Sequence, residues 1–143
     1  MMEIIFLSRC EIKDLIYEFV EDYYSRDFEL DALSAKYTQS AKVLAAFLDG
    51  IAAGFVSFYM NDTINKIAYI SMVVVKKRFR HQGIATMLMK DVIQECIINH
   101  FNVIRLEVNN SNQKAINMYI GLGFVFESVA SDNSTYYRLE ILE

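Results

Sequence analysis

The spacing of hydrophobic side chains changes from strand-like to helix-like near the start of the chain. Residues 2–7 form a short apolar run that predicts an opening strand. Across residues 11–25 apolar side chains recur three and four positions apart, and charged side chains fill the other positions, so we expect an amphipathic helix there. A second, shorter helix is expected over residues 29–38.

The next part of the chain has the pattern of a hairpin followed by a buried strand. Residues 43–48 and 51–60 are apolar and β-compatible, and Asp49-Gly50 between them is a tight-turn signal. After a polar break at 61–66, residues 68–75 are apolar without alternation. Such a run predicts a central strand that is covered on both faces.

Helical and strand-like segments alternate in the rest of the chain. They predict, in chain order, a helix over 83–99, a strand over 103–108, a helix over 112–121 that ends near Gly121 and Gly123, and strands over 124–130 and 135–142. A crossover through the first of these helices makes the strands 68–75 and 103–108 parallel, and ligand sites lie at the carboxyl ends of such strands.

The chain shows no internal repeat, no linker-like tract and no proline in its 143 residues. We therefore expect one domain over residues 1–143, with an α/β (α+β) fold. Its mixed, mostly antiparallel sheet is flanked by helices and contains one parallel strand pair.

Composition narrows the classes of function. A formal charge of −4 without a dense Lys/Arg run argues against a nucleic-acid binder. No apolar stretch is long enough for a membrane span, and the N-terminus lacks a signal-peptide pattern, so we expect a soluble, cytoplasmic protein without a membrane partner. Cys10, Cys96 and two histidines are too few and too dispersed for a metal site, and both cysteines are expected in the core.

A candidate phosphate site lies where the central strand gives way to a helix. In the segment RHQGIA, residues 80–85, Gly83 and the small Ala85 let a ligand approach the main chain. The first N–H groups of the helix can bind phosphate oxygens, and Arg78 and Arg80 with two nearby lysines add positive charge. The alternative is that Gly83 only allows the turn between the strand and the helix. The pattern lacks the features of a dinucleotide fingerprint or a P-loop.

A second motif strengthens this interpretation. Residues 105–124 read RLEVNNSNQKAINMYIGLGF. With the loop before it, this segment resembles the GCN5-related N-acetyltransferase (GNAT) superfamily, in which R/Q-x-x-G-x-G/A is followed by N-x-x-A-x-x-x-Y-x-x-x-G-F. The matching residues are Arg80, Gly83 and Ala85, then Asn112, Ala115, Tyr119, Gly123 and Phe124.

The resemblance implies a GNAT-like fold and acetyl-CoA as cosubstrate, with no metal. In similar proteins this loop holds the pyrophosphate, which implies a role here for Arg80, His81, Gln82, Gly83, Ile84, Ala85 and Thr86. The main chain of Val73, Val74 and Val75 is implied to bind the pantetheine arm, as is Asn112. Lys77 stands where many members have a proline.

Two residues are the candidates for proton transfer. The resemblance implies that Tyr119 is the general acid, and a free tyrosine has a pKa close to that of an aliphatic thiol. Its alternative role is core packing on the same helix face. Glu107 ends a strand and is the candidate general base, directly or through water. The alternatives for Glu107 are a pair with Arg105 or simple solvation.

These observations predict an N-acetyltransferase that passes an acetyl group from acetyl-CoA to a primary amine by direct attack in a ternary complex. The acceptor is a small metabolite, an amino sugar or a protein N-terminus, and the sequence does not choose among them. A non-catalytic acyl-CoA-binding or sensing module is the alternative, and the joint presence of Tyr119 and Glu107 favours the enzyme. Oligomeric state, a homodimer included, is left open.

Overall fold

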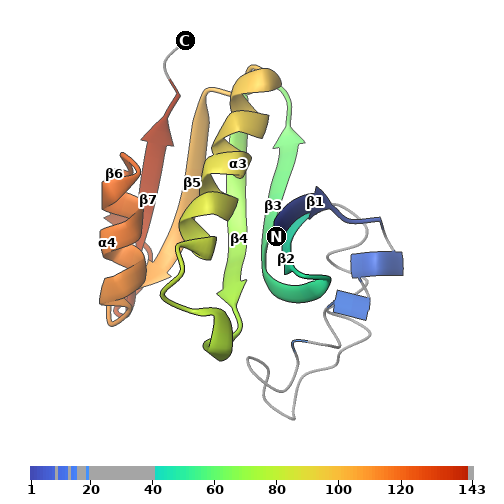
Figure 1. The fold of residues 1–143 in the computed structure, drawn as a ribbon. Helices are drawn as coiled ribbons and strands as arrows, with labels where there is room; N and C mark the ends of the chain where they lie inside the picture. Colours follow the sequence, from blue (N-terminus) through green and yellow to red (C-terminus); the bar gives the residue numbers. More distant parts are fainter. Residues whose placement is uncertain (9, 13, 16–18, 20–40, 142–143) are drawn as a thin grey trace. The chain divides into compact units, whose positions relative to one another are not determined.

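The computed structural model describes residues 1–8, 10–12, 14–15, 19 and 41–141. Its elements are β1 (Met2–Phe6), β2 (Lys42–Leu48), β3 (Ile51–Asp62), β4 (Ile67–Val75), the short 3₁₀ helix η1 (Lys77–Phe79), α3 (Ile84–Ile98), β5 (Val103–Asn109), α4 (Gln113–Gly121), β6 (Val125–Val129) and β7 (Ser134–Glu140). The strands form one seven-stranded sheet in the order β1-β2-β3-β4-β5-β7-β6 (Figure 1).

The directions of the strands confirm the predicted fold class. β4 and β5 pair in parallel, with residues 67–70 opposite residues 103–106. The pairs β1–β2, β2–β3, β5–β7 and β6–β7 are antiparallel. The sheet is therefore mixed and mostly antiparallel, and its parallel pair lies on either side of the crossover through α3.

The first helix begins at a pair of reciprocal hydrogen bonds. The main-chain N–H of Ser8 donates to Glu11 Oε1 at 3.0 Å, and the N–H of Glu11 donates to Ser8 Oγ at 3.4 Å. This capping box satisfies two donors that a helix start otherwise leaves without acceptors. The described residues 10–12, 14–15 and 19 are helical, as predicted. The other positions of that helix, and the whole helix expected over 29–38, lie outside the described residues.

Two details of the sequence-based prediction were wrong. β4 was expected to be covered on both faces, but buried and half-buried side chains alternate in its first half, so one of its faces is only partly covered. Cys96 is fully buried as expected, whereas Cys10 is exposed, because it lies on the outer side of the first helical turn. The turn η1 was not predicted at all.

The chain divides into two units, each with its own packing. In the first, residues 1–59 and 72–89, the described side chains of the first helix pack on β2, β3 and β4. Phe19 meets Phe55 edge-on, with ring centroids 5.1 Å apart. At Gly54 a Cβ atom would lie 2.7 Å from the carbonyl oxygen of Val74, so two stretches of main chain come unusually close there.

The second unit, residues 60–71 and 90–143, is built around β5. Ile104, Leu106 and Val108 are buried, whereas Arg105 and Glu107 between them are half-buried and exposed, so β5 has one apolar and one polar face. At the end of the strand order, β6 carries apolar side chains that are more than half exposed: Val125, Phe126 and Val129.

Within the part of the chain that the structure describes, no helix is long and apolar enough to cross a membrane. The same residues contain no group of three or more His, Cys, Asp or Glu side chains that could hold a metal ion. The expectation of one domain over residues 1–143 stays a prediction.

Candidate functional site

The first part of the candidate site is the turn that follows β4. The N–H of Lys76 donates to the carbonyl of Ala53 at 2.9 Å, which ties the end of β4 to β3. The N–H of Phe79 then donates to the carbonyl of Lys76 at 2.9 Å, and this bond closes η1. Two bonds therefore fix the direction in which the chain leaves the sheet.

After η1 two residues of the loop adopt the left-handed backbone conformation. His81 has φ +66° and Gly83 has φ +76°. Glycine adopts this region freely, but a residue with a side chain rarely does. The surrounding loop must therefore hold His81 in this conformation. A Cβ atom added at Gly83 would meet nothing within 4 Å, so the space over this residue is open. Successive N–H groups in such a loop form a concave donor surface that suits an anion.

The helix α3 continues this donor surface. It begins at Ile84, and the N–H of Met87 donates to the carbonyl of Gly83 at 3.0 Å. The N–H groups of the first helical residues have no acceptor within the helix, and the helix start carries a partial positive charge. The side chain of Ile84 is 2% exposed, so this residue can offer a ligand only its main chain. Ala85 and Thr86 are half-buried, while His81, Gln82 and Gly83 are exposed.

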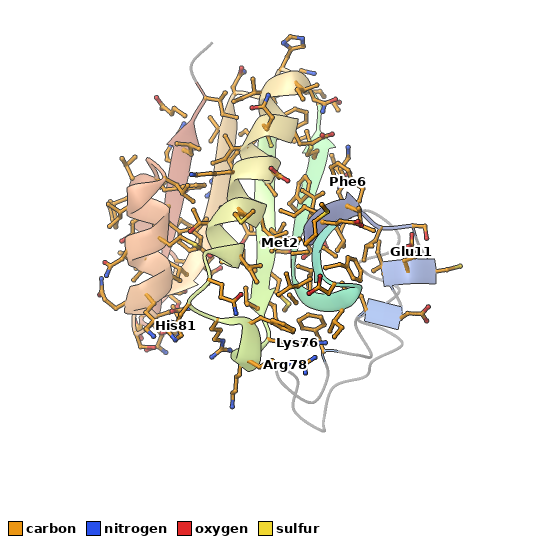
Figure 2. The ribbon with its side chains drawn as sticks, in the orientation of Figure 1. Met2, Phe6, Glu11, Lys76, Arg78 and His81 are labelled. Atoms are coloured by element: carbon orange, nitrogen blue, oxygen red, sulfur yellow. The ribbon has the colours of Figure 1, made fainter. Side chains whose placement is uncertain are left out.

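Basic side chains surround the turn and are held in place. Arg80 Nε donates to the carbonyl of Val75 at 3.2 Å, so the guanidinium is fixed at the end of β4. The ammonium of Lys76 lies 5.0 Å from the ring centroid of Phe19, and the guanidinium of Arg78 lies 4.7 Å from that of Phe79. Figure 2 labels Lys76, Arg78 and His81 on this segment between β4 and α3. The turn therefore combines main-chain donors with positive charge.

The three valines that were predicted to bind the pantetheine arm end β4. Val74 is 5% exposed, and its side chain belongs to the core of the first unit. Val73 and Val75 are half-buried. The main chain of Gly54 lies close to the carbonyl of Val74. The end of β4 can occupy this position only because residue 54 is a glycine.

The second part of the candidate site lies on β5 and α4. Asn112 caps α4, because its side-chain oxygen accepts a hydrogen bond from the N–H of Ala115 at 3.3 Å. Asn112 thus has a structural role that the sequence did not predict, and this role uses its side-chain oxygen. The hydrogen bonds of Asn109 to the N–H and hydroxyl of Ser111 fix the approach to the cap.

Tyr119 is buried on α4 at 8% exposure. Its ring packs on Phe124 with centroids 5.8 Å apart, and the N–H of Phe124 donates to its carbonyl at 3.0 Å. Burial raises the pKa of the phenol to about 12. Tyr119 therefore packs as the alternative interpretation held, and it also holds its proton at neutral pH, as a general acid must. The close match with the pKa of a thiol, argued from the free amino acid, is lost.

Glu107 is exposed on the polar face of β5, and its partner is not the one considered from the sequence. Arg105 instead contacts Glu127 of β6, with Nε–Oε1 2.9 Å. Glu107 Oε2 accepts a hydrogen bond from Ser134 Oγ at 2.6 Å. Arg105 and Glu107 lie on the same face of β5, but the guanidinium of Arg105 binds the carboxylate of Glu127 instead.

Sequence reasoning missed three neighbours of Glu107: Tyr69, Ser134 and Tyr136. Tyr136 lies directly opposite Glu107 in the β5–β7 register. Burial, and next the charge of Glu107, raise the pKa of Tyr69. The parallel β4–β5 pair brings Tyr69 opposite Arg105, near Glu107, whereas Ser134 and Tyr136 come from the β5–β7 pair. For Ser134 and Tyr136 the missing signal was the order of the last strands, which the sequence did not predict.

The structure thus groups the predicted residues in two sets, one in each unit. The first unit contains the end of β4, with Val73, Val74 and Val75, and residues 80–86, which follow η1. Glu107, Asn112 and Tyr119 lie in the second unit, on β5, at the start of α4 and on α4.

Comparison with known proteins finds a family and a fold. The model of the acetyltransferase (GNAT) family matches residues 10–124. The chain is 37% identical over 57 residues to N-alpha-acetyltransferase 30 of Saccharomyces cerevisiae, a match that covers 40% of this chain and 32% of that protein. It also matches N-alpha-acetyltransferase 30 of Xenopus laevis, and it spans about a third and about a quarter of the length of these relatives.

Solved structures with the same fold share little sequence with the chain. The ribosomal-protein-S18-alanine N-acetyltransferase of Escherichia coli superposes with a TM-score of 0.83 at 18% identity, covering 100% of this chain and 96% of that one. The PaiA N-acetyltransferase of Thermoplasma acidophilum, solved in complex with coenzyme A, gives 0.75 at 17% identity, with 99% of each chain covered. These likenesses concern the fold.

Proposed function

The chain belongs to the acetyltransferase (GNAT) family, and on that premise we propose that it transfers an acetyl group from acetyl-CoA to a primary amine. The reaction runs by direct attack of the amine on the thioester in a ternary complex. We propose further that residues 1–143 act as one N-acetyltransferase domain.

One observation carries the proposal: the loop 80–86 has the form of a diphosphate cradle. Two left-handed residues, an open space over Gly83 and the start of α3 present main-chain donors, and Arg80 is fixed beside them. A coenzyme A diphosphate carries the charge and the acceptor oxygens that such donors need. Ligand contacts at Ile84 and Val74 are assigned to main-chain atoms, because both side chains are buried.

Proton transfers follow from the chemistry of the reactants. An alkylammonium must lose a proton before its nitrogen can attack, and we assign that proton to Glu107, directly or through water. The new C–N bond forms as the thioester carbonyl becomes tetrahedral, and the C–S bond then breaks. Tyr119 gives its proton to the departing sulfur and regains one from the amide nitrogen, so the products are the amide and coenzyme A.

A protein α-amino group is the acceptor that the comparisons support best among the three candidates. Both curated relatives are N-alpha-acetyltransferases, although the matches cover less than half of this chain. Amino sugars and small metabolite amines are the other acceptors to be tested.

The proposal is tested by release of the coenzyme A thiol with a panel of acceptors. Short peptides with free N-termini, amino sugars and small diamines are incubated with acetyl-CoA and the protein, and free thiol is measured. We expect acceptor-dependent release with at least one peptide. Binding of acetyl-CoA without release for any acceptor contradicts catalysis and supports the acyl-CoA-binding module instead.

A pair of glycine variants tests the cradle. Gly83→Glu places a carboxylate where the diphosphate is proposed to bind, and we expect affinity for coenzyme A to fall at least about 100-fold by calorimetry, a loss of roughly 3 kcal/mol. Gly50→Glu is the matched control, because Gly50 has φ +82° and equally open space but lies in the β2–β3 turn. Equal affinity of the two variants would mean that the loop has another role.

A further inference from the structure

The carboxylate of Glu107 needs an external restraint if it is to act as a base. Its side chain is exposed on β5, and an exposed glutamate has several rotamers of similar energy. A base acts efficiently only when it lies within hydrogen-bond reach of the proton that it removes. The rate of proton removal therefore depends on whatever fixes this side chain.

Ser134 supplies such a restraint from the neighbouring strand. Ser134 Oγ donates a hydrogen bond to Glu107 Oε2 at 2.6 Å. Ser134 lies two register positions from the residue opposite Glu107, so the bond runs diagonally across the strand pair. It occupies Oε2, and Oε1 is the atom left for an incoming amine.

The hydroxyl of Ser134 is itself held in place. Ser134 is 8% exposed, and its Oγ lies 2.8 Å from Ser131 Oγ across the β6–β7 turn. The carbonyl of Ser134 accepts hydrogen bonds from the N–H groups of Ala130 and Ser131, at 3.0 and 3.2 Å. A buried residue with its main chain and side chain both bonded has little rotational freedom, so it can impose an orientation on Glu107.

The same turn is fastened to the segment that leads into α4. The N–H of Asn110 donates to the carbonyl of Asn133 at 2.8 Å, and Thr135 Oγ1 donates to Asn110 Oδ1 at 2.6 Å. Asn110 lies two residues before Asn112, the cap of the helix that carries Tyr119. The β6–β7 turn thus holds a fixed place relative to both β5 and α4.

We infer that Ser134 is a positioning residue, whose hydroxyl holds the carboxylate of Glu107 in the orientation that the acceptor amine requires. This inference rests on the proposed function. It predicts that the turn contributes to proton transfer through Glu107 and not through contact with acetyl-CoA.

The structural half of the inference is tested without any activity. Crystal structures of the wild type and of Ser134→Ala are compared at high resolution. We expect one carboxylate position in the wild type, bonded to Ser134, and more than one in the variant. A wild-type Glu107 that points away from Ser134, or an unchanged single position in Ser134→Ala, overturns the inference, whatever reaction the protein catalyses.

The catalytic half is tested by steady-state kinetics. We expect Ser134→Ala to lower kcat about tenfold with the KM for acetyl-CoA changed less than about twofold, and Ser134→Thr, which keeps the hydroxyl, to recover most of the loss. Ser128→Ala, in the same hairpin, is the control with unchanged kcat. Unchanged kcat in Ser134→Ala, or an equal loss in the alanine and threonine variants, overturns the positioning role.

A double variant separates this inference from the function on which it rests. In a Glu107→Gln background, measured with enzyme in excess so that slow rates are visible, Ser134→Ala should add less than about a twofold loss, because both changes remove one function. A full additional tenfold loss means that Ser134 acts elsewhere. A wild type that releases no thiol with any amine refutes the proposed function, and the crystallographic comparison still decides the orientation.

Discussion

Burial determines what the phenol of Tyr119 can do at the scale of a single residue. With its pKa raised to about 12, Tyr119 keeps its proton throughout the range in which an amine becomes nucleophilic. It is a weaker acid than a free tyrosine, so the acid role proposed for it does not rest on a pKa matched to that of a thiol. The packing of its ring on Phe124 restricts the orientations that the side chain can adopt.

The Tyr119→Phe variant tests the acid at this scale. We expect turnover to fall by about 100-fold, the lower end of what general acid catalysis contributes, while the affinity for acetyl-CoA stays within about twofold. Thiol release and calorimetry measure the two quantities. Equal turnover in variant and wild type would remove Tyr119 from the mechanism.

Alkaline unfolding checks the raised pKa of Tyr119 independently of activity. The folded pKa, about 12, lies above the ordinary value of 10, so the stabilisation from the neutral phenol is complete below pH 10 and is lost as pH rises toward 12. Urea midpoints at pH 9, 10 and 11 should therefore fall less steeply for Tyr119→Phe than for the wild type. Parallel curves would mean that the phenol is not buried.

At the scale of elements, Gly54 sets how closely β3 meets the end of β4. A Cβ atom there would lie 2.7 Å from the carbonyl oxygen of Val74 and 3.2 Å from Val75 Cγ2, and the first of these contacts is with rigid main chain. The sequence showed a glycine inside a strand, but a glycine alone does not say which segment approaches it.

Gly54→Ala should lower the free energy of unfolding by about 2 kcal/mol, because the strands must separate to admit the methyl group. Gly121→Ala, at the end of α4 with nothing within 4 Å of the added atom, is the control and should change it by less than about 0.5 kcal/mol. Urea unfolding measures both. Equal stability of the two variants would show that β3 and β4 have room to spare.

The elements also show how far sequence reasoning reaches. Every described strand was placed within two residues, because apolar runs and turn signals such as Asp49-Gly50 are local. The break between the strand and the helix at residues 80–86 was placed for the same reason, although the left-handed conformation of His81 was not predicted. The interactions of Ser134 and Tyr69 with Glu107 were missed because they depend on strand pairing between residues far apart in the chain.

At the scale of the whole molecule, stability should depend on one carboxylate shared between strands. Arg105 of β5 and Arg138 of β7 lie directly opposite each other, a repulsive pair that Glu127 of β6 compensates by contacting both. Hydrogen bonds from Arg105 hold the pKa of Glu127 below its usual range. This stabilisation is therefore present above the ordinary pKa of a glutamate and is lost as pH falls through the lowered value.

Glu127→Gln should reduce the free energy of unfolding by about 1 kcal/mol at pH 7, and the difference from the wild type should shrink below about pH 4. Glu140→Gln removes only the exposed contact with Arg138 and should cost much less. Denaturant titrations at pH 7, 5 and 3 measure the effect. A difference that persists unchanged at pH 3 would mean that charge is not its source.

The outermost strand has a practical consequence for work with the purified protein. β6 ends the sheet, and Val125, Phe126 and Val129 are more than half exposed on it. An edge strand with exposed apolar side chains can pair with a strand of another molecule, and such pairing promotes aggregation in concentrated samples. Natural sheets often carry a lysine on an edge strand to prevent such pairing, so Phe126→Lys should reduce aggregation.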